Sequence, residues 1–181
     1  MPHAVRIRPA HREDATQLAD MWLEFGAYYE AIDPVQFQTP EMAGLVEWVE
    51  DELLRERSDD ELWLVAEEEG RLLGYIRAQI LRPQDGAAHQ ILRTAGSTGV
   101  KTDSLMVTES ARREGVGRAL MEAVEGWGSG RGATEAFVIS YARSPTSVPF
   151  YEDGLGYSSH TTGYWKPLDR GHHRSGGPAS T

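Results

Sequence analysis

Apolar side chains recur at helical spacing in three separate segments of the chain. The first segment begins near Glu13, and its apolar residues are Ala15, Leu18, Ala19, Trp22 and Phe25. Side chains three and four residues apart lie on one face of an α-helix. We therefore expect an amphipathic helix from Glu13 onward, which ends before the two prolines of "AIDPVQFQTP".

Two further helices are expected downstream. For the second, Thr39 is the expected N-cap, Pro40 the first helical residue, and Glu41 lies near the positive end of the dipole. Its buried stripe is Met42, Leu45, Val46, Val49 and Leu53. The third helix follows Gly115, and its stripe is Val116, Ala119, Leu120, Ala123, Val124 and Trp127. Four spaced glycines are expected to end it: Gly126, Gly128, Gly130 and Gly132.

Shorter apolar runs predict strands at 4–10, 62–66, 73–81, 102–107, 133–140 and 158–168. The second and third of these form a hairpin around the turn "EEEGR". Because 102–140 has the order strand–helix–strand, we expect a right-handed parallel crossover there. A short helix is expected within 144–157, "SPTSVPFYEDGLGY". The loop 82–101 is long enough to be either functional or disordered.

The composition of the 181 residues is typical of one globular domain. We place this domain at 1–168 and expect 169–181 to be a disordered polar tail, in which His172 and His173 have no partners for a metal site. The net charge of −10 argues against binding to nucleic acid or a membrane surface, and it suits either a cationic substrate or only an acidic surface. Disulfides and thiolate chemistry are excluded because the chain has no cysteine. Without a signal peptide or an apolar run of about 18 residues, we expect a cytoplasmic protein.

The stretch "ARREGVGRAL" places two arginines and a Gly-x-Gly pair at the start of the third helix. Leu120 stands where a dinucleotide-binding fingerprint needs a glycine, and no P-loop pattern occurs. At a helix start the first N–H groups have no internal partner, and the dipole is positive. Glycines there let a diphosphate approach the bare amides, and Arg112, Arg113 and Arg118 add positive charge. The alternative is a helix that merely begins with glycine and carries solvated arginines.

This stretch resembles the acetyl-CoA signature of the GNAT N-acetyltransferase superfamily, Arg/Gln-x-x-Gly-x-Gly/Ala, as Arg112-x-x-Gly115-x-Gly117. "IRPAHREDATQLADMW" is similar to the first strand and helix of the family, "LVAEEEGRLLGYI" to its second and third strands, and "FYEDGLGY" to its Phe-Tyr-Glu segment. The resemblance implies an α/β (α+β) fold with a mixed, mostly antiparallel sheet. This sheet is splayed in the middle and flanked by helices.

The resemblance also implies a binding site for acetyl-CoA as co-substrate, without a metal. The diphosphate would lie at Gly115, Val116 and Gly117, and the pantetheine arm along the splayed strand. A backbone N–H near Met106 or Val107 would stabilise the oxyanion. Two departures weaken the match. Ser144 and Ser147 stand where many members have an asparagine and a small residue, although their hydroxyls can still donate to the pantetheine or phosphate region of the cofactor. The segment "FYEDGLGY" is one residue longer than usual.

The implied reaction is direct attack of a primary amine on the thioester in a ternary complex. Tyr151 matches the tyrosine that protonates the departing thiolate in many members, or it is only an aromatic packed beside Phe150. For the base, Asp103 is one candidate because the family sometimes uses acids on this strand. His89, in the long loop, is another, and an ordered water without a dedicated base is a third.

The acceptor site is expected between the first two helices and the loop 82–101. Five acidic or aromatic residues near one helix end could hold an ammonium ion, or be a solvated helix end: Glu24, Tyr28, Tyr29, Glu30 and Asp33. A small cationic amine is the first expectation, and a protein lysine or N-terminus the alternative. A non-catalytic acetyl-CoA sensor is a hypothesis of another class. A homodimer is suggested only by analogy with the family.

Overall fold

The computed structural model describes residues 5–55 and 58–166. Its centre is a five-stranded sheet in the order β1-β2-β3-β4-β5. The strands are β1 (Arg6–Pro9), β2 (Glu61–Glu68), β3 (Arg71–Leu81), β4 (Gly99–Val107) and β5 (Glu135–Val138). The first four pair antiparallel, whereas β4 and β5 are parallel. This confirms the predicted fold class and the parallel crossover.

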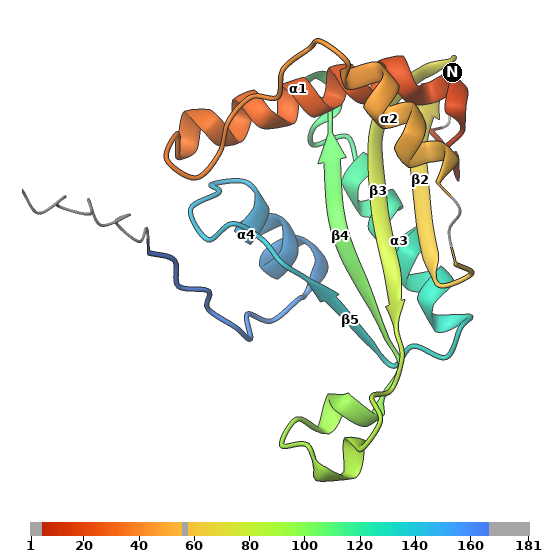
Figure 1. Ribbon diagram of the computed structural model, residues 1–181, viewed down its shortest axis with the longest axis vertical. Helices are drawn as coiled ribbons and strands as arrows, with labels where there is room; N and C mark the ends of the chain where they lie inside the picture. The colour runs from red at the N-terminus through yellow and green to blue at the C-terminus, as the bar shows by residue number, and fades with distance from the viewer. Residues whose placement is uncertain (1–4, 56–57, 167–181) are drawn as a thin grey trace, which may run out of the picture.

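Helices cover both faces of the sheet (Figure 1). Helices α1 (Ala15–Ile32) and α2 (Leu45–Leu54) lie on one face, and α3 (Val116–Ser129) lies on the other. Alternation along β3 separates the two cores: Ile76 packs in the cluster with α3, and Tyr75 packs in the cluster with α1 and α2. The face that bears Tyr75 also bears the next odd-numbered residues of β3, which matters for the site below.

The sheet splays between β4 and β5. Their ladder runs only from Gly99 opposite Glu135 to Thr102 opposite Val138, although β4 continues to Val107. Beyond Thr102 the two chains diverge, as Figure 1 shows. The predicted splay is therefore present, and it leaves one side of residues 103–107 without a strand partner in the described part of the chain.

The predicted start of the second helix is wrong. Thr39 is not an N-cap, because its backbone N–H and its hydroxyl both donate to Glu30 on α1. Pro40 packs so closely on Gly26 that a Cβ there would lie 2.4 Å from its ring. The helix begins only at Leu45, after Gly44 in the left-handed conformation, and Met42 is exposed.

Two further boundaries differ from the prediction. Strand β4 begins at Gly99 rather than at 102, so the connection from β3 is 82–98, which contains short 3-10 helices at Ala87–His89 and Arg93–Gly96. In Figure 1 this connection extends beyond the end of the sheet. Helix α3 also runs through Gly126 and Gly128 to Ser129. Gly128 is needed for a close approach, because a Cβ would lie 2.7 Å from Val100 on β4.

The predicted last strand does not form in the described part of 158–168. Residues 158–166 have no regular structure, and Tyr164 and Trp165 are exposed. A strand forms only when it bonds to a neighbouring edge. Among the described residues β5 pairs only with β4, so residues 158–166 do not add a strand to the other edge of β5. The short helix predicted within 144–157 is present as α4 (Ser147–Pro149), which continues as a π-helical turn at Phe150–Gly154. Residues 167–181, with His172, His173 and the proposed tail, lie outside the described residues.

The two glycines inside α3 give a matched pair of substitutions. Gly128→Ala should lower the free energy of unfolding by about 1–3 kcal/mol, because its methyl group would overlap buried Val100. Gly126→Ala has nothing within 4 Å of its Cβ and should raise stability by up to about 1 kcal/mol. Urea unfolding of both variants measures this difference, and equal changes would contradict the close packing of α3 on β4.

Candidate functional site

The start of α3 presents backbone donors at the open end of the helix. Gly115 is the N-cap in the left-handed conformation, with φ of 86°. The first helical hydrogen bond runs from Ala119 N–H to Gly115 O, so the N–H groups of residues 116–118 precede it. These bare amides lie at the positive end of the dipole, where an anion binds favourably.

Glycine is required at the two positions of the Gly-x-Gly pair for different structural reasons. Gly115 has φ of 86°, a conformation that disfavours any side chain, and nothing lies near its would-be Cβ. Gly117 instead allows a close contact, since a Cβ would lie 3.2 Å from the ring of Phe150. The second glycine therefore seats Phe150, and with it the neighbouring Tyr151, against the helix start.

The three arginines near this helix start differ in what they contact. Arg112 pairs with Glu24 on α1 at 3.3 Å, donates to Val107 O at 3.3 Å and lies over the ring of Tyr28. Arg118 donates to Gly154 O at 2.5 Å and so ties α3 to the π-helical turn. Arg113 is exposed, with φ of 67°. Of the three side chains, that of Arg113 is the one with no partner within residues 5–55 and 58–166.

The free edge of β4 contributes the second set of backbone groups. Thr108 N–H donates to Leu73 O, so Thr108 and Leu73 form a hydrogen-bonded pair of the antiparallel ladder. Such pairs alternate with non-bonded ones. The N–H and C=O groups of Met106, which lies opposite Tyr75, therefore point toward β3. The N–H and C=O groups of Val107 and Leu105 point away from β3, into the splay. Of the two predicted oxyanion donors, the register favours Val107 and adds Leu105, which the sequence analysis missed.

Tyr151 lies in the π-helical turn after α4, beside Phe150 and Tyr157. Burial raises the pKa of its hydroxyl, and the nearby Tyr29 on α1 raises it further. No group among the described residues forms a hydrogen bond with this hydroxyl. The side chain is thus held protonated between α1 and the turn, without a competing partner.

The two serines at the start of α4 bond mainly to their own segment and to α1. Ser144 is buried, its hydroxyl lies 2.8 Å from that of Ser147, and it accepts from Ser147 N–H at 3.2 Å. Tyr28 reaches across from α1 to Thr146 at 2.8 Å and to Ser144 at 3.3 Å. These hydroxyls therefore anchor the loop before α4 to α1.

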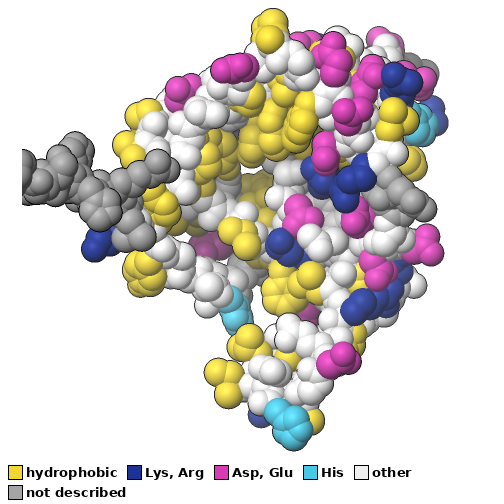
Figure 2. Space-filling view, in the orientation of Figure 1, with side chains coloured by type: hydrophobic (Ala, Val, Ile, Leu, Met, Phe, Trp, Pro, Cys, Tyr) yellow, Lys and Arg dark blue, Asp and Glu magenta, His cyan; other side chains and the backbone are white. Residues whose placement is uncertain are grey.

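The C-terminal end of α1 bridges the open side of the splay. Asp33 accepts a 2.5 Å hydrogen bond from Tyr141 and pairs with Arg143 at 3.3 Å. Tyr29, Phe37 and Tyr141 stack together between these segments, with ring centroids 4.9 to 6.1 Å apart. In Figure 2 the face below this bridge is hollowed between α1 and the segment around α4.

The acids predicted to hold an ammonium ion at this helix end already have partners. Glu24 pairs with Arg112 and accepts from Glu109 N–H, and Glu30 accepts from Thr39. The hydrogen bond from Tyr141 lowers the pKa of Asp33, and it outweighs the opposing effect of desolvation. The geometry therefore supports the alternative in which these acids hold the chain's own segments together.

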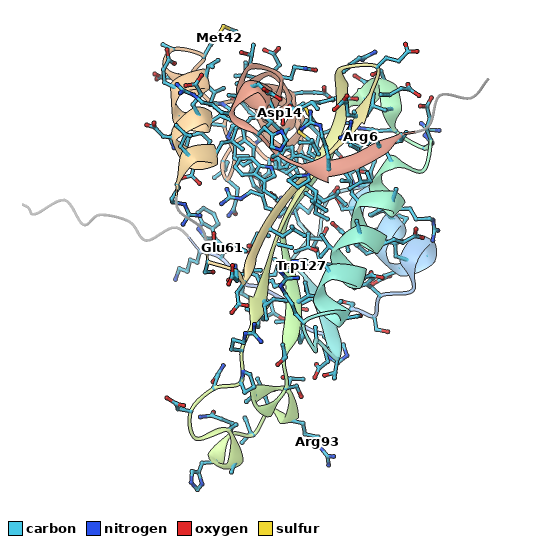
Figure 3. All side chains as sticks on the ribbon, turned by 90° about the vertical axis from the view of Figure 1, so that its right-hand side faces the viewer. Arg6, Asp14, Met42, Glu61, Arg93 and Trp127 are labelled. Atoms are coloured by element: carbon cyan, nitrogen blue, oxygen red, sulfur yellow. The ribbon has the colours of Figure 1, made fainter. Side chains whose placement is uncertain are left out.

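Asp103 lies on β4 where the splay begins. Its carboxylate accepts from Gln79 at 2.7 Å and pairs with Lys101 at 2.8 Å. It borders a cavity of about 110 Å³ on the α2 face of the sheet, with Arg55, Glu61, Leu62, Trp63, Arg77, Ala78 and Gln79. His89 is exposed in the 82–98 connection, which lies at the far end of the sheet, near the labelled Arg93 in Figure 3. The geometry brings Asp103, and not His89, to the splay.

Three further polar groups near the splay were not predicted. The hydroxyls of Tyr75, Ser104 and Ser140 are buried without a hydrogen-bond partner among the described residues. Burial raises the pKa of Tyr75, and the nearby Ser104 hydroxyl opposes this shift. Buried hydroxyls normally have partners, and none of these three residues borders the cavity at Asp103. Strand alternation could have placed Tyr75 on this face, but its lack of a partner depends on the tertiary packing.

No helix among the described residues is both long and apolar enough to cross a membrane. Within the same residues, no three His, Asp or Glu side chains gather where they could hold a metal ion.

The sequence matches the acetyltransferase (GNAT) family over residues 20–157. The chain belongs to this family. A comparison with curated proteins found no match.

Solved structures share the GNAT fold at low sequence identity. One is a tetramutant of the BH1408 protein from Bacillus halodurans (TM-score 0.75, 18% identity, 90% of this chain and 99% of that one). Another is a ribosomal-protein-alanine N-acetyltransferase from Brucella melitensis (0.63, 18%, 92% and 100%). A third is an aminoglycoside acetyltransferase from a soil metagenomic sample (0.60, 19%, 92% and 99%). At these identities the likeness establishes the fold alone.

The bridge at Asp33 should be visible in the pH dependence of stability. Because the pKa of Asp33 is lowered in the folded state, its contribution is present above the unfolded value of about 3.9 and is lost as the pH falls through the folded pKa. Asp33→Ala should therefore be less stable than the wild type at pH 7, and the difference should shrink toward pH 3. Urea unfolding at both pH values measures this.

Asp20→Ala is the control, because Asp20 lies on the same helix and is exposed. A stability loss of equal size in both variants, or one independent of pH, would contradict the role of Asp33.

Proposed function

We propose that this GNAT acetyltransferase moves the acetyl group of acetyl-CoA to a primary amine of a small molecule, within a ternary complex. The observation that carries the proposal is the meeting of two sets of open backbone groups. The unpaired edge of β4 comes directly before the short connection 108–115, and the bare amides at residues 116–118 come directly after it. We further propose that 1–168 is the single catalytic domain.

The described residues fit an acetyl-CoA molecule. The diphosphate would accept from the amides at Val116 and Gly117, with the exposed side chain of Arg113 as counter-charge. The pantetheine arm would bond to the β4 edge as a pseudo-strand, through the main-chain groups of Leu105. Acetyl-CoA supplies the activated acetyl group, and the remaining chemistry falls to the chain's own residues.

The amine must lose a proton before it can attack. An alkylamine with a pKa near 10.4 has a neutral form that costs about 4–5 kcal/mol at pH 7. Asp103 at the edge of the cavity is the candidate base, either directly or through a water molecule. The N–H of Val107, which the strand register directs away from β3, would stabilise the negative charge that develops on the acyl oxygen.

Tyr151 is proposed as the acid that protonates the departing thiolate. Its raised pKa keeps it protonated at neutral pH, but it also makes the phenol a weaker acid. The same dry surroundings raise the pKa of a buried thiol, so the two groups remain matched.

A small acceptor is favoured over a protein amine because the cavity at Asp103 has a volume of only about 110 Å³. A non-catalytic sensor would need the phosphate-binding amides but not a protonated, unpartnered tyrosine beside the splay. Release of free thiol from acetyl-CoA in the presence of amines separates the two: a sensor binds acetyl-CoA and releases none.

The phosphate grip can be tested with fragments of the cofactor. S-acetyl-4′-phosphopantetheine should bind about a hundredfold more tightly than S-acetylpantetheine, because two charge-assisted hydrogen bonds contribute about 1.5 kcal/mol each. Isothermal titration calorimetry measures both affinities. Equal affinities would reject the helix start as the phosphate site.

The role of Tyr151 predicts a loss of turnover without a loss of binding. Tyr151→Phe should lower kcat about a hundredfold and leave the acetyl-CoA affinity nearly unchanged. Because the pKa of Tyr151 is raised, deprotonation of this group should not reduce wild-type activity below about pH 10.

Tyr164→Phe is the matched control, since Tyr164 is 94% exposed. A parallel fall of kcat and affinity in Tyr151→Phe would mean that the ring only packs.

A further inference from the structure

The cavity at Asp103 lies on the side of the sheet opposite α3. Figure 3 shows Glu61, which borders the cavity, on one side of the strands and Trp127 of α3 on the other. Helices α1 and α2 cover the upper part of this face, and the cavity opens below them. Since the amides of α3 approach from the opposite side, this face is the one left for the acceptor.

The charged groups that line the cavity are balanced. Two are cationic, Arg55 and Arg77, and two are anionic, Glu61 and Asp103. Their partners just outside keep the balance: Glu52 pairs with Arg77, and Lys101 pairs with Asp103. A site for a polyamine or an aminoglycoside needs an excess of acids, which this cavity does not have. Its charges instead complement a molecule that carries one positive and one negative group.

Arg77 is prepared to receive a carboxylate. Its guanidinium lies 4.8 Å from the ring centroid of Trp63, and Glu52 holds it from one side at 3.4 Å. Its side chain keeps 30% of its exposure, so part of the guanidinium remains accessible. A planar guanidinium fixed by stacking offers its donors in the geometry that suits a carboxylate.

Asp103 provides the opposite charge at a suitable separation. The neighbouring Ser104 is directly opposite Arg77 in the β3–β4 ladder. Adjacent strands lie about 4.8 Å apart, so one small molecule can reach both side chains.

We propose that the acceptor is a free amino acid, with its carboxylate at Arg77 and its amino group at Asp103. This proposal rests on the proposed transferase function and specifies its substrate class. The amine nitrogen forms a bond to the acetyl carbon as the carbon–sulfur bond breaks. The ammonium nitrogen loses one proton before the attack and a second after it, and the thiolate takes up one proton, so the products are an N-acetyl amino acid, CoA and one released proton.

Matched pairs of acceptors test the proposal directly. Phenylalanine and leucine should be acetylated with a kcat/KM at least tenfold above phenethylamine and 3-methylbutylamine, which lack only the carboxylate. Thiol release from acetyl-CoA measures all four. Equal or better activity with the decarboxylated amines would overturn the proposal while leaving the transferase function intact.

Calorimetric titration of the amino acids in the presence of CoA shows whether the transferase function fails while the amino-acid site remains. Binding of the amino acids without thiol release from any acceptor would support the cavity as their site and reject the transferase function. Absence of amino-acid binding would overturn the proposal.

Arg77→Gln identifies the group that reads the carboxylate. It should raise KM for phenylalanine at least tenfold and leave KM for phenethylamine unchanged, and Arg77→Lys should restore part of the difference. Arg82→Gln is the control, because Arg82 pairs with Asp60 and does not line the cavity. Equal effects of Arg77→Gln on both acceptors would mean that Arg77 only supports the fold, which would contradict its proposed role.

Discussion

The loss of a strand partner beyond Thr102 is the constraint on which the rest of this structure depends. A buried main chain normally satisfies its N–H and C=O groups within the sheet. Residues 103–107 do so on the β3 side only, because β5 leaves the ladder after Val138. Arg112 donates to Val107 O, which leaves the main-chain groups of Leu105 and the N–H of Val107 open to something strand-like. The sheet of this fold therefore has an edge to which an extended ligand can bond.

The splay must also be held open, and α1 does this from outside the sheet. Its end bonds to the segment after β5 through Asp33 and Tyr28, and Glu24 holds Arg112 in the loop before α3. These contacts join the two diverging arms without filling the space between them. Asp33, which was expected to bind an ammonium ion, thus joins α1 to the segment after β5. The cavity at Asp103 lies apart from this bridge, and none of the bridging residues lines it.

How far the sequence could predict this structure depended on whether each pattern was local. Helix α3 and the β2–β3 hairpin were predicted because periodicity and turn glycines are properties of short segments. The N-cap at Thr39 failed because contacts with Gly26 and Glu30 of α1 outweighed local capping preference. The last strand failed for a similar reason, since pairing depends on a distant edge.

In the candidate site, too, local patterns could be predicted and tertiary contacts could not. The positive φ of Gly115 agrees with its place before an amphipathic run, where a glycine was expected at the helix start. Arg77 and Gln79 were missed although they alternate with core residues of β3, because only the pairing of β3 with β4 brings them beside Asp103. The bulge between Arg77 and Ala78 shifts this register, and no local pattern in the sequence indicates it.

The pairing of Asp103 with Lys101 bears on how an acceptor amine can react. An isolated carboxylate would stabilise the ammonium form, raise its pKa and so oppose attack. Here the ammonium group meets a carboxylate that already carries a lysine partner at 2.8 Å, so the local charge is close to zero. Desolvation in the cavity then lowers the pKa of the amine, because burial disfavours its charged form. In the proposed site, the same balance of charges that suits a zwitterion would ease loss of the proton and reduce the strength required of any base.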